Sequence, residues 1–328
     1  MNGFFTAEEV KSTTRKVKHE TCAVCGLYKT VRTPRMEAFG NCKRAILNVG
    51  EGPGEFEDRR GRQWQGKVGK VLQEAYKMLG FDLFEHCINI NSVNCRPMTK
   101  DGNNRAPDPK EINCCRSRVL KVIEQYKPKL IVLFGNSAIM SLIGHRWKKD
   151  LGGIFKWRGW AIPDRDFNAW LCPVFHPSFT ERSEREVETI WMQDLKHALS
   201  MTDEPLPKFD DESKQIMIVD ECPSVSEVES PFSVDFETTG LKCHDVSVHS
   251  IVCVAVCDNK NRAWVFMMNE VNKRRLRRLL MSDKGKIAQN LKFENSWAQN
   301  LLDCEVRNWV WDTMLASHVL NNRSDITS

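Results

Sequence analysis

The sequence predicts an α/β protein built from two domains, and three observations support this expectation. Short apolar runs typical of strands, such as residues 130–134 (LIVLF), alternate with helical patterns through the first two hundred residues. A glycine-rich segment follows the first of these strands and precedes a helix, the place where α/β folds bind ligands. The chain of 328 residues exceeds one typical domain, and residues 201–214, rich in proline and acidic residues, are expected to be a linker.

The composition is that of ordinary globular protein, with 41% hydrophobic and 28% charged residues. The net charge of +5 allows nucleic-acid binding without requiring it. Residues Met1–Glu20 lack the apolar core of a signal peptide, and no run is long enough to span a membrane. The 13 cysteines therefore predict a reducing cytoplasm, where clustered thiols bind metal rather than form disulfides.

The predicted elements of the first domain follow one another as strand, glycine-rich turn and helix. The strands are expected at Ala45–Val49, Cys87–Ile90, Leu130–Phe134 and Ala169–Phe175, and the helices at Val68–Leu79, from Pro109 onwards, at Ser137–Leu142 and at Glu184–Ser200. Residues 151–160 (LGGIFKWRGW) are expected to be a loop, either on a DNA surface or facing solvent.

The glycine-rich segment 50–66 (GEGPGEFEDRRGRQWQG) combines backbone freedom with charge. A turn of this kind places backbone N–H groups and a helix N-terminus against an anionic ligand, and its arginines suit phosphate contacts. A charged surface loop is the alternative, and neither a Walker nor a dinucleotide pattern is present. His176, directly after the strand 169–175, lies where α/β folds bind ligands, although a packed or capping histidine fits the same position.

Four cysteines form a candidate metal site. Cys22 and Cys25 make a C-x-x-C pair in a loop-like stretch, and Cys95 and Cys115 are the two distant partners. Four thiolates hold either a [4Fe–4S] cluster or Zn²⁺, and the spacing does not decide between them. Cys114 is a possible substitute for its neighbour.

Four segments taken together resemble the family 4 uracil-DNA glycosylases, the iron–sulfur branch of that superfamily. They are residues 50–66, 91–97 (NSVNCRP), 111–116 (EINCCR) and 176–179 (HPSF), and the resemblance covers about residues 20–200. It implies that residues 1–200 form a three-layer α/β/α domain with a parallel sheet. It also implies hydrolysis of the N-glycosidic bond of uracil after the nucleotide has been flipped out of the stack.

The resemblance assigns a role to each matching residue. It gives the cluster ligands as Cys22, Cys25, Cys95 and Cys115, the uracil-binding residues as Gly52, Trp64 and Asn91, and the catalytic residues as Glu51 and His176. It favours [4Fe–4S] over zinc, and the family usually has phenylalanine where this chain has Trp64. The chemistry agrees, because an asparagine amide matches the O4 and N3–H edge of uracil. A histidine suits the negative charge that develops on the departing base.

The second domain, residues 215–328, is predicted to be a partial metal-dependent nuclease. Strands are expected at Gln215–Val219, near Phe232–Glu237, at Val248–Ala255 and at Ala263–Met267, and helices from Asn290 and from Trp311. Asp235 and Glu237 alternate with apolar neighbours, so both project from one strand face and attract a divalent metal ion. A solvated strand face is the alternative. The basic run 273–278 suits phosphate contacts or a solvated helix face.

Three segments of this domain, DFETTGL, QNLKFE and DTMLASHVLN, resemble the ribonuclease-H-like DEDD-type 3′–5′ exonuclease domain of family A DNA polymerases. The resemblance implies Mg²⁺ or Mn²⁺ held by Asp235, Glu237 and Glu294, the last standing where the family has aspartate. The third motif of the family is absent, so the site is expected to be incomplete.

The two resemblances together describe the N-terminal part of a phage-type DNA polymerase. The expected partners are DNA, either single-stranded or primer–template, and the remaining polymerase chain, in a bacterial or phage-infected host cytoplasm. The alternative is a catalytically degenerate module that binds DNA or a replisome partner. A third interpretation, a zinc-stapled structural domain, predicts a colourless protein.

Overall fold

The computed structural model describes residues 22–147, 151–180, 185–207 and 216–320. The chain forms two compact units, Met1–Lys208 and Phe209–Ser328, and each has its own hydrophobic core. The polar N-terminal segment, the second half of the expected linker, Glu184 and Gln215 lie outside the described residues. Within the described residues, no helix has both the length and the apolar character needed to cross a membrane.

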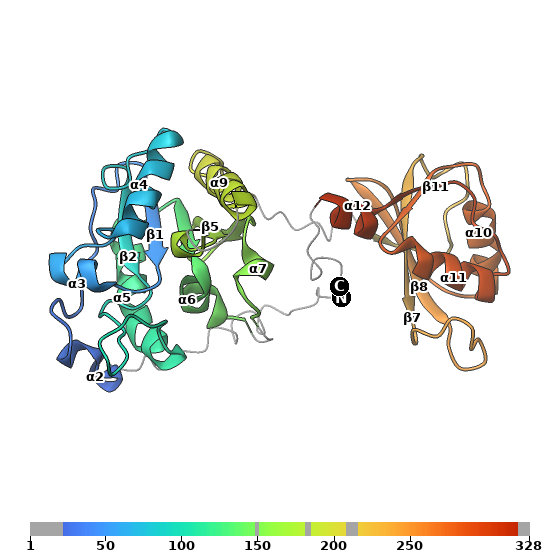
Figure 1. The fold of residues 1–328 in the computed structure, drawn as a ribbon. Coiled ribbons are helices and arrows are strands. Elements are labelled where there is room, and N and C mark those ends of the chain that lie inside the picture. Colours follow the sequence, from blue (N-terminus) through green and yellow to red (C-terminus); the bar gives the residue numbers. More distant parts are fainter. Residues whose placement is uncertain (1–21, 148–150, 181–184, 208–215, 321–328) are drawn as a thin grey trace. The chain divides into compact units, whose positions relative to one another are not determined.

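The first unit is built on a five-stranded sheet with the order β2-β1-β3-β5-β4 (Figure 1). The strands are β1 (Ile46–Gly50), β2 (Cys87–Asn91), β3 (Leu130–Phe134), β4 (Ile162–Asp164) and β5 (Ala169–Val174). The first three neighbouring pairs are parallel, and only β4 runs antiparallel at the edge. The strands β1, β2 and β3 are buried along their whole length, as expected of a parallel sheet covered on both faces.

Helices cover both faces of this sheet, which confirms the three-layer α/β/α prediction. They are α2 (Cys22–Cys25), α3 (Glu55–Arg60), α4 (Lys67–Met78), α5 (Pro109–Tyr126), α6 (Gly135–Ile139), α7 (Ile154–Trp157), α8 (Pro177–Thr180) and α9 (Arg185–Ser200), with a 3-10 turn at Leu27–Lys29. The helix α5 begins at Pro109 because Asp108 and Glu111 form a capping box, in which the Asp108 N–H donates to Glu111 Oε2 at 2.8 Å.

The structure corrects three expectations in the first unit. Cys22–Cys25 is a helical turn rather than a loop, and residues 151–160 contain the short helix α7. The helix after β3 begins at once, at Gly135, and continues as a π-helical turn over Met140–Gly144. Gly135 permits this start because its φ is +81°, and an added Cβ would lie 3.1 Å from the Cβ of His176.

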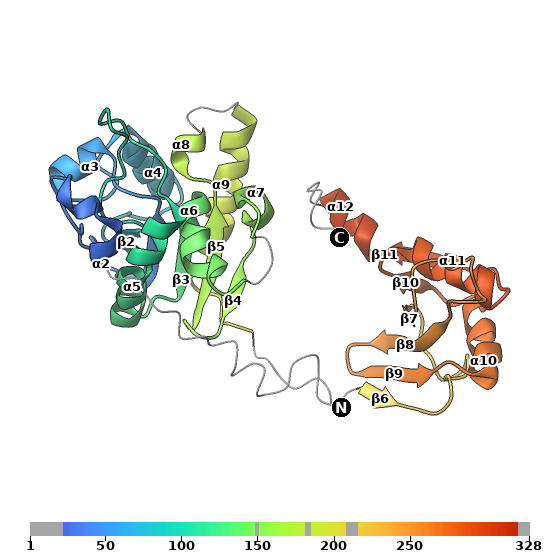
Figure 2. The ribbon, with the colours of Figure 1, turned by 90° about the horizontal axis from the view of Figure 1, so that it is seen from below.

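The second unit has a six-stranded mixed sheet with the order β11-β10-β7-β8-β9-β6 (Figure 2). Its strands are β6 (Ile216–Ile218), β7 (Phe232–Thr238), β8 (Ile251–Asn259), β9 (Arg262–Met267), β10 (Lys286–Ala288) and β11 (Trp309–Asp312), and its helices are α10 (Glu270–Leu280), α11 (Leu291–Leu301) and α12 (Thr313–Leu320). Trp311 was expected to open a helix but lies in β11, where it pairs with Ile287, so α12 begins only at Thr313.

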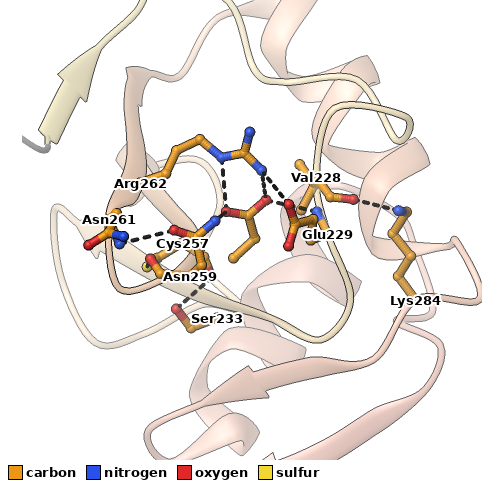
Figure 3. Close-up of polar contacts among 9 residues, drawn as sticks. Val228, Glu229, Ser233, Cys257, Asn259, Asn261, Arg262 and Lys284 are labelled. Carbon is orange, nitrogen blue, oxygen red and sulfur yellow. Dashed lines mark hydrogen bonds and ion pairs between the residues drawn. The ribbon is translucent and has the colours of Figure 1, made fainter.

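A polar cluster fixes the entry into β7 (Figure 3). Arg262 Nε, at the β8–β9 turn, donates to Asp258 at 3.1 Å, and the Glu229 N–H donates to the same carboxylate at 2.8 Å. Lys284 Nζ donates to the Val228 carbonyl with a distance of 2.5 Å. These contacts hold the segment before β7 in place, and β7 is the strand that carries the candidate metal ligands.

Candidate active sites

The carboxyl ends of the parallel strands meet at one edge of the first sheet. Gly50 and Asn91 are the last residues of β1 and β2, and His176 follows β5. The structure thereby brings the predicted residues Trp64 and Asn91 against Gly50, with Glu51 and Gly52 next in the chain, and the Trp64 ring lies near the His176 ring. This edge is where open α/β sheets bind ligands.

Gly50 lets two side chains approach the strand end. A Cβ on Gly50 would lie 2.3 Å from Asn91 Oδ1 and 3.1 Å from Trp64 Cζ2, so any larger residue would displace both groups. Asn91 is 3% exposed, and its Nδ2 has no hydrogen-bond partner among the described residues. A buried donor without an acceptor costs about 1–3 kcal/mol, so a ligand carbonyl oxygen at this point would be stabilised.

Backbone contacts fix Asn91 and the loop after β1. The Asn91 carbonyl accepts from Asn94 Nδ2 at 2.9 Å, and the Asn91 N–H donates to Asn94 Oδ1 at 3.3 Å. The Ser92 N–H donates to the Gly50 carbonyl at 2.8 Å, and the Ser92 hydroxyl donates to the Glu51 carbonyl at 2.5 Å. The loops after β1 and β2 therefore hold each other in a single arrangement.

His176 is oriented by the residue two positions later. The Ser178 N–H donates to His176 Nδ1 at 3.3 Å, and the Ser178 hydroxyl lies 2.8 Å from the same nitrogen. Because Nδ1 accepts the backbone N–H, a neutral imidazole carries its proton on Nε2. His176 is thus a hydrogen-bond donor at the strand edge.

Trp64 is enclosed and held at both its backbone and its ring. It is 3% exposed with a φ of +60°, and its backbone N–H donates to the Glu57 carboxylate. Burial raises the pKa of the Glu57 carboxyl above its ordinary value, and N–H donors from Gly54 and Trp64 limit that rise. Its ring lies 5.8 Å from the His176 ring and 5.4 Å from the Phe134 ring, measured between centroids.

A buried polar network under Trp64 was not predicted. Asn89 Oδ1 accepts from the Trp64 indole N–H at 3.1 Å and from Asn48 Nδ2 at 3.0 Å, and Tyr76 donates to Asn48 Oδ1 at 2.7 Å. Asn89 Nδ2 donates to two backbone carbonyls, both at 3.0 Å. The signal in the sequence was an asparagine inside each of two otherwise apolar strands, where an unpaired amide would be costly.

The four predicted cluster cysteines lie near one another, two on α2, one in the loop after β2 and one on α5. The Arg35 N–H donates to Cys95 Sγ at 3.2 Å, and Arg35 Nε donates to Cys22 Sγ at 3.3 Å. Burial first, and the neighbouring Cys95, Cys25 and Cys22 to a smaller extent, raise the pKa of the Cys115 thiol to about 12. No three histidine, cysteine, aspartate or glutamate side chains among the described residues converge closely enough to hold a single metal ion.

The second unit places carboxylates on β7 and α11. Asp235 and Glu237 are exposed on the same face of β7, as predicted from the strand period, whereas Glu294 on α11 is 3% exposed. The Oε2 atom of Glu294 has no hydrogen-bond partner among the described residues. Burial first, and the nearby Asp235 and Asp312 carboxylates to a smaller extent, raise the pKa of the Glu294 carboxyl to about 7.

Asp312 is a structural carboxylate that the sequence interpretation missed. Its side chain accepts from the N–H groups of Asn290 at 3.1 Å and Leu291 at 2.9 Å, which begin α11, and of Met314 at 2.9 Å in α12. Asp312 therefore fixes the start of the helix that carries Glu294. The signal was the aspartate directly before a helical pattern, a position typical of a cap.

Comparison with known proteins gives a family for each unit. The family described as the uracil DNA glycosylase superfamily matches residues 37–196, and the family described as 3′–5′ exonuclease matches residues 212–327. The type-4 uracil-DNA glycosylase of Thermotoga maritima is 32% identical over 201 residues, which cover 60% of this chain and 96% of that protein.

A longer relative spans both units. The DNA polymerase of Bacillus phage SP01 is 26% identical over 329 residues, covering 88% of this chain and 34% of the polymerase, so this chain spans about a third of that protein. Among solved structures, Brucella melitensis NrnC with bound Mg²⁺ aligns with a TM-score of 0.30 and 19% identity. That alignment covers 34% of this chain and 57% of that one.

Proposed function

The chain belongs to the type-4 uracil-DNA glycosylase family through its first unit, and we propose that this unit hydrolyses the N-glycosidic bond of uracil in DNA. The observation that carries the proposal is that two hydrogen-bond donors lie at the same edge of the sheet. Asn91 offers a buried Nδ2 without a partner, and His176 offers an Nε2–H. A uracil ring presents carbonyl oxygens that accept from both.

Base recognition follows from the amide of Asn91. Its Nδ2 donates to O4 of a uracil flipped out of the stack, and its Oδ1 accepts from N3–H. Cytosine presents an amino group and an unprotonated ring nitrogen at the same positions, so both contacts are lost. The hydrogen bonds to Asn94 leave the amide of Asn91 available, because they use only the backbone of Asn91.

Bond cleavage follows from His176 and the loop after β1. As the glycosidic bond breaks, negative charge develops on O2 of the departing uracil, and His176 Nε2–H and the backbone N–H of Gly52 stabilise it. The carboxylate of Glu51 orients the attacking water and stabilises the positive sugar. The roles of His176, Gly52 and Glu51 in bond cleavage are part of this proposal.

The test is uracil release from an end-labelled single-stranded oligonucleotide by anaerobically purified protein whose iron has been counted. Release of free uracil supports the proposal. Tight DNA binding without release by iron-replete protein contradicts it and favours the alternative, a catalytically degenerate DNA-binding or replisome module.

We further propose that Cys22, Cys25, Cys95 and Cys115 hold a [4Fe–4S] cluster. The residues present fit this group, because Cys25, Cys95 and Cys115 share one small apolar core and Cys22 lies close enough to affect the pKa of Cys95 and Cys115. Arg35 donates N–H bonds to the sulfurs of Cys22 and Cys95. Four thiolates suit either one zinc ion or a four-iron cluster, and the family resemblance favours the cluster. When bound, the cluster supplies a structural cross-link between α2, the loop after β2 and α5.

Cys95→Ala is expected to lose iron and to lower the melting temperature of the first unit, since cluster binding is coupled to folding. Iron content and visible absorbance measure the first effect, and calorimetry measures the second. Cys114→Ala is the matched control, because Cys114 is buried beside Cys115 but is not assigned as a ligand. A Cys95→Ala protein with full iron content would reject this ligand, and iron loss in Cys114→Ala would reassign the neighbouring one.

For the second unit we propose binding of Mg²⁺ or Mn²⁺ by Asp235, Glu237 and Glu294 for hydrolysis of DNA from the 3′ end. The proposal is supported by the unpartnered, buried Oε2 of Glu294 and by the charge of Asp235 beside it. Two-metal hydrolysis of phosphodiesters uses clustered carboxylates. In the part of the chain that the structure describes, these three side chains do not converge closely enough to hold one ion, so the proposal requires them to move together when the metal binds. The preferred substrates of the chain are then single-stranded or primer–template DNA in a bacterial or phage-infected cytoplasm, with the rest of a DNA polymerase as partner.

The raised pKa of Glu294, about 7, predicts a pH-dependent stability. Without metal, the folded state holds the Glu294 proton more tightly than the unfolded chain, so stability falls as pH rises from about 4.5 to about 7. The free-energy change over this window is about 3 kcal/mol. Glu294→Gln should therefore stabilise the second unit at pH 8 and change little at pH 4.5, as measured by calorimetry.

Manganese should reverse this dependence in the unchanged protein, because Mn²⁺ binds the ionised carboxylate and stabilises the folded state by mass action. The expected gain in melting temperature on adding Mn²⁺ is larger at pH 8 than at pH 5.5 and is reduced in Glu294→Gln. An equal Mn²⁺ effect in both proteins would exclude Glu294 as a ligand.

A further inference from the structure

Two exposed phenylalanines lie beside the residues assigned to uracil excision. Phe56 on α3 and Phe155 on α7 are each 62% exposed. A single exposed apolar side chain is ordinary, but two exposed aromatic rings beside one site indicate a surface that a partner covers. The contacts of each ring show where that surface lies.

Phe155 is fixed next to His176. Its ring lies 5.0 Å from the Phe175 ring and 5.8 Å from the Phe179 ring, measured between centroids, with 69° and 89° between the planes. Edge-to-face contacts of this kind are favourable, and α7 also packs against β5. Phe175 comes directly before His176 and Phe179 three positions after it. Phe155 therefore presents an exposed ring whose position is already set at the carboxyl end of β5.

Phe56 is connected to Trp64 in a similar way. A Cβ on Gly66 would lie 3.9 Å from Cβ and Cδ2 of Phe56, so the Phe56 side chain lies against the residue that precedes α4. Gly66 is two positions after Trp64, and the Trp64 ring lies 5.8 Å from the His176 ring. Phe56 and Phe155 are thus joined to Trp64 and His176, respectively, through direct neighbours.

The charges around Phe56 favour an anionic partner. The exposed cations close to it in the chain are Arg59, Arg60, Arg62 and Lys67. The carboxylate of Glu55 pairs with Arg59. Asp58 is 4% exposed, and its carboxylate accepts two backbone N–H groups at 2.8 and 3.1 Å. The side chains that face solvent here are therefore mainly cationic, which suits the phosphates of DNA.

We propose that Phe56 and Phe155 stack on the bases of single-stranded DNA that flank the flipped nucleotide, while the arginines of α3 contact the adjoining phosphates. Aromatic rings among cations form a platform for single strands, because every base has a flat face that can stack. In a duplex those faces are already stacked on neighbouring bases, so the two rings favour single-stranded over duplex DNA. This inference rests on the proposed function, which places the flipped uracil beside Trp64 and His176.

The test measures binding of the unchanged protein, Phe56→Ala and Phe155→Ala to a labelled single-stranded oligonucleotide that contains no uracil. Fluorescence anisotropy at fixed salt, in buffer without divalent metal ions, gives the affinity without DNA cleavage. Each substitution is expected to weaken binding to the single strand by about 5- to 100-fold, the usual effect of losing one stacked base. Binding to the matching duplex should change less than about twofold. Met78→Ala is the matched control, because Met78 is 78% exposed at the end of α4 that is far from Trp64.

Two further variants show whether the flat ring itself is needed. Phe155→Trp should bind the single strand as tightly as the unchanged protein, whereas Phe155→Leu, which is apolar but not flat, should bind as weakly as Phe155→Ala. Phe155→Leu also replaces Phe155→Ala if the latter fails to fold, because leucine keeps most of the packing volume.

Salt dependence separates stacking from phosphate contacts. The slope of log affinity against log salt concentration should stay the same in both phenylalanine variants, which remove no charge. Its magnitude should fall by about 0.7 in Arg60→Gln, since one phosphate contact to a single strand is lost.

The outcomes separate this inference from the proposed function. Unchanged single-strand affinity in the folded Phe56 and Phe155 variants overturns stacking, whether or not the protein releases uracil. An equal loss on single-stranded and duplex DNA would mean that the rings support the loops instead of binding unstacked bases, and it also overturns the inference. Weaker single-strand binding by the variants, with no uracil release by any of the proteins, supports stacking and overturns the glycosylase proposal.

Discussion

Replacing His176 with alanine is expected to lower kcat for uracil release by about 10²–10³-fold, the usual effect of removing one donor to a developing negative charge. The structure supports a donor role because Nδ1 already accepts from the Ser178 N–H, which leaves the proton on Nε2. The loss should appear in kcat rather than in DNA affinity, because the charge on the leaving uracil exists only as the bond breaks.

Single-turnover release of uracil measures the chemical step directly, and fluorescence anisotropy of a labelled oligonucleotide measures DNA affinity. His197→Ala is the matched control, since His197 is an exposed histidine on α9. The iron content of each protein should be equal, so that a lost cluster is not mistaken for a lost donor. A His176→Ala protein that releases uracil within twofold of the normal rate would remove His176 from the mechanism.

The sequence was sufficient to predict the α/β fold and the residues that the sheet edge brings together. Parallel strands are buried on both faces, so each appears as a short apolar run, as in residues 130–134. Because the carboxyl ends of such strands lie at one edge, residues at or directly after these ends, such as Asn91 and His176, come to the same edge of the sheet. The order of these segments along the chain therefore predicts which residues lie at the same edge of the sheet.

The contacts that hold the site could not be predicted in the same way. Asn48, Asn89 and Tyr76 come from different elements and meet only when the sheet is assembled, so no local pattern joins them. Asp312 is distant in the chain from the helix start that it caps, for the same reason. Hydrogen bonds between polar groups that are distant in the sequence depend on tertiary packing, and local residue propensities do not predict that packing.

The wrong expectations were all local, and tertiary contacts explain them. Residues 22–25 form a helical turn, α2, that packs against α5. Trp311 continues a strand because Lys286–Ala288 offers it a neighbouring edge. In both places a weak local preference is overridden by a partner that lies far away in the sequence.

Asn91→Asp is expected to change base selectivity by the largest factor, lowering the preference for uracil over cytosine by about 10⁴-fold. Sites built to hydrogen-bond a substrate group reject analogues by about this factor when the match is lost. An ionised aspartate only accepts, so it repels O4 of uracil and suits the amino group of cytosine. The fold should be retained, because the side chains are nearly isosteric and the bonds to Asn94 involve only the backbone of Asn91.

The pH dependence of this variant separates recognition from simple damage to the site. Burial at 3% exposure disfavours the charged form, so the pKa of an aspartate at position 91 should rise. Below that pKa the protonated carboxyl donates to O4 as the Asn91 amide does, and uracil release should partly return as pH falls from 8 to 5.5. Paired uracil and cytosine oligonucleotides, measured at both pH values, check this expectation. Equal loss of uracil release at both pH values, with no gain on cytosine, would mean that Asn91 supports the strand edge without reading the base.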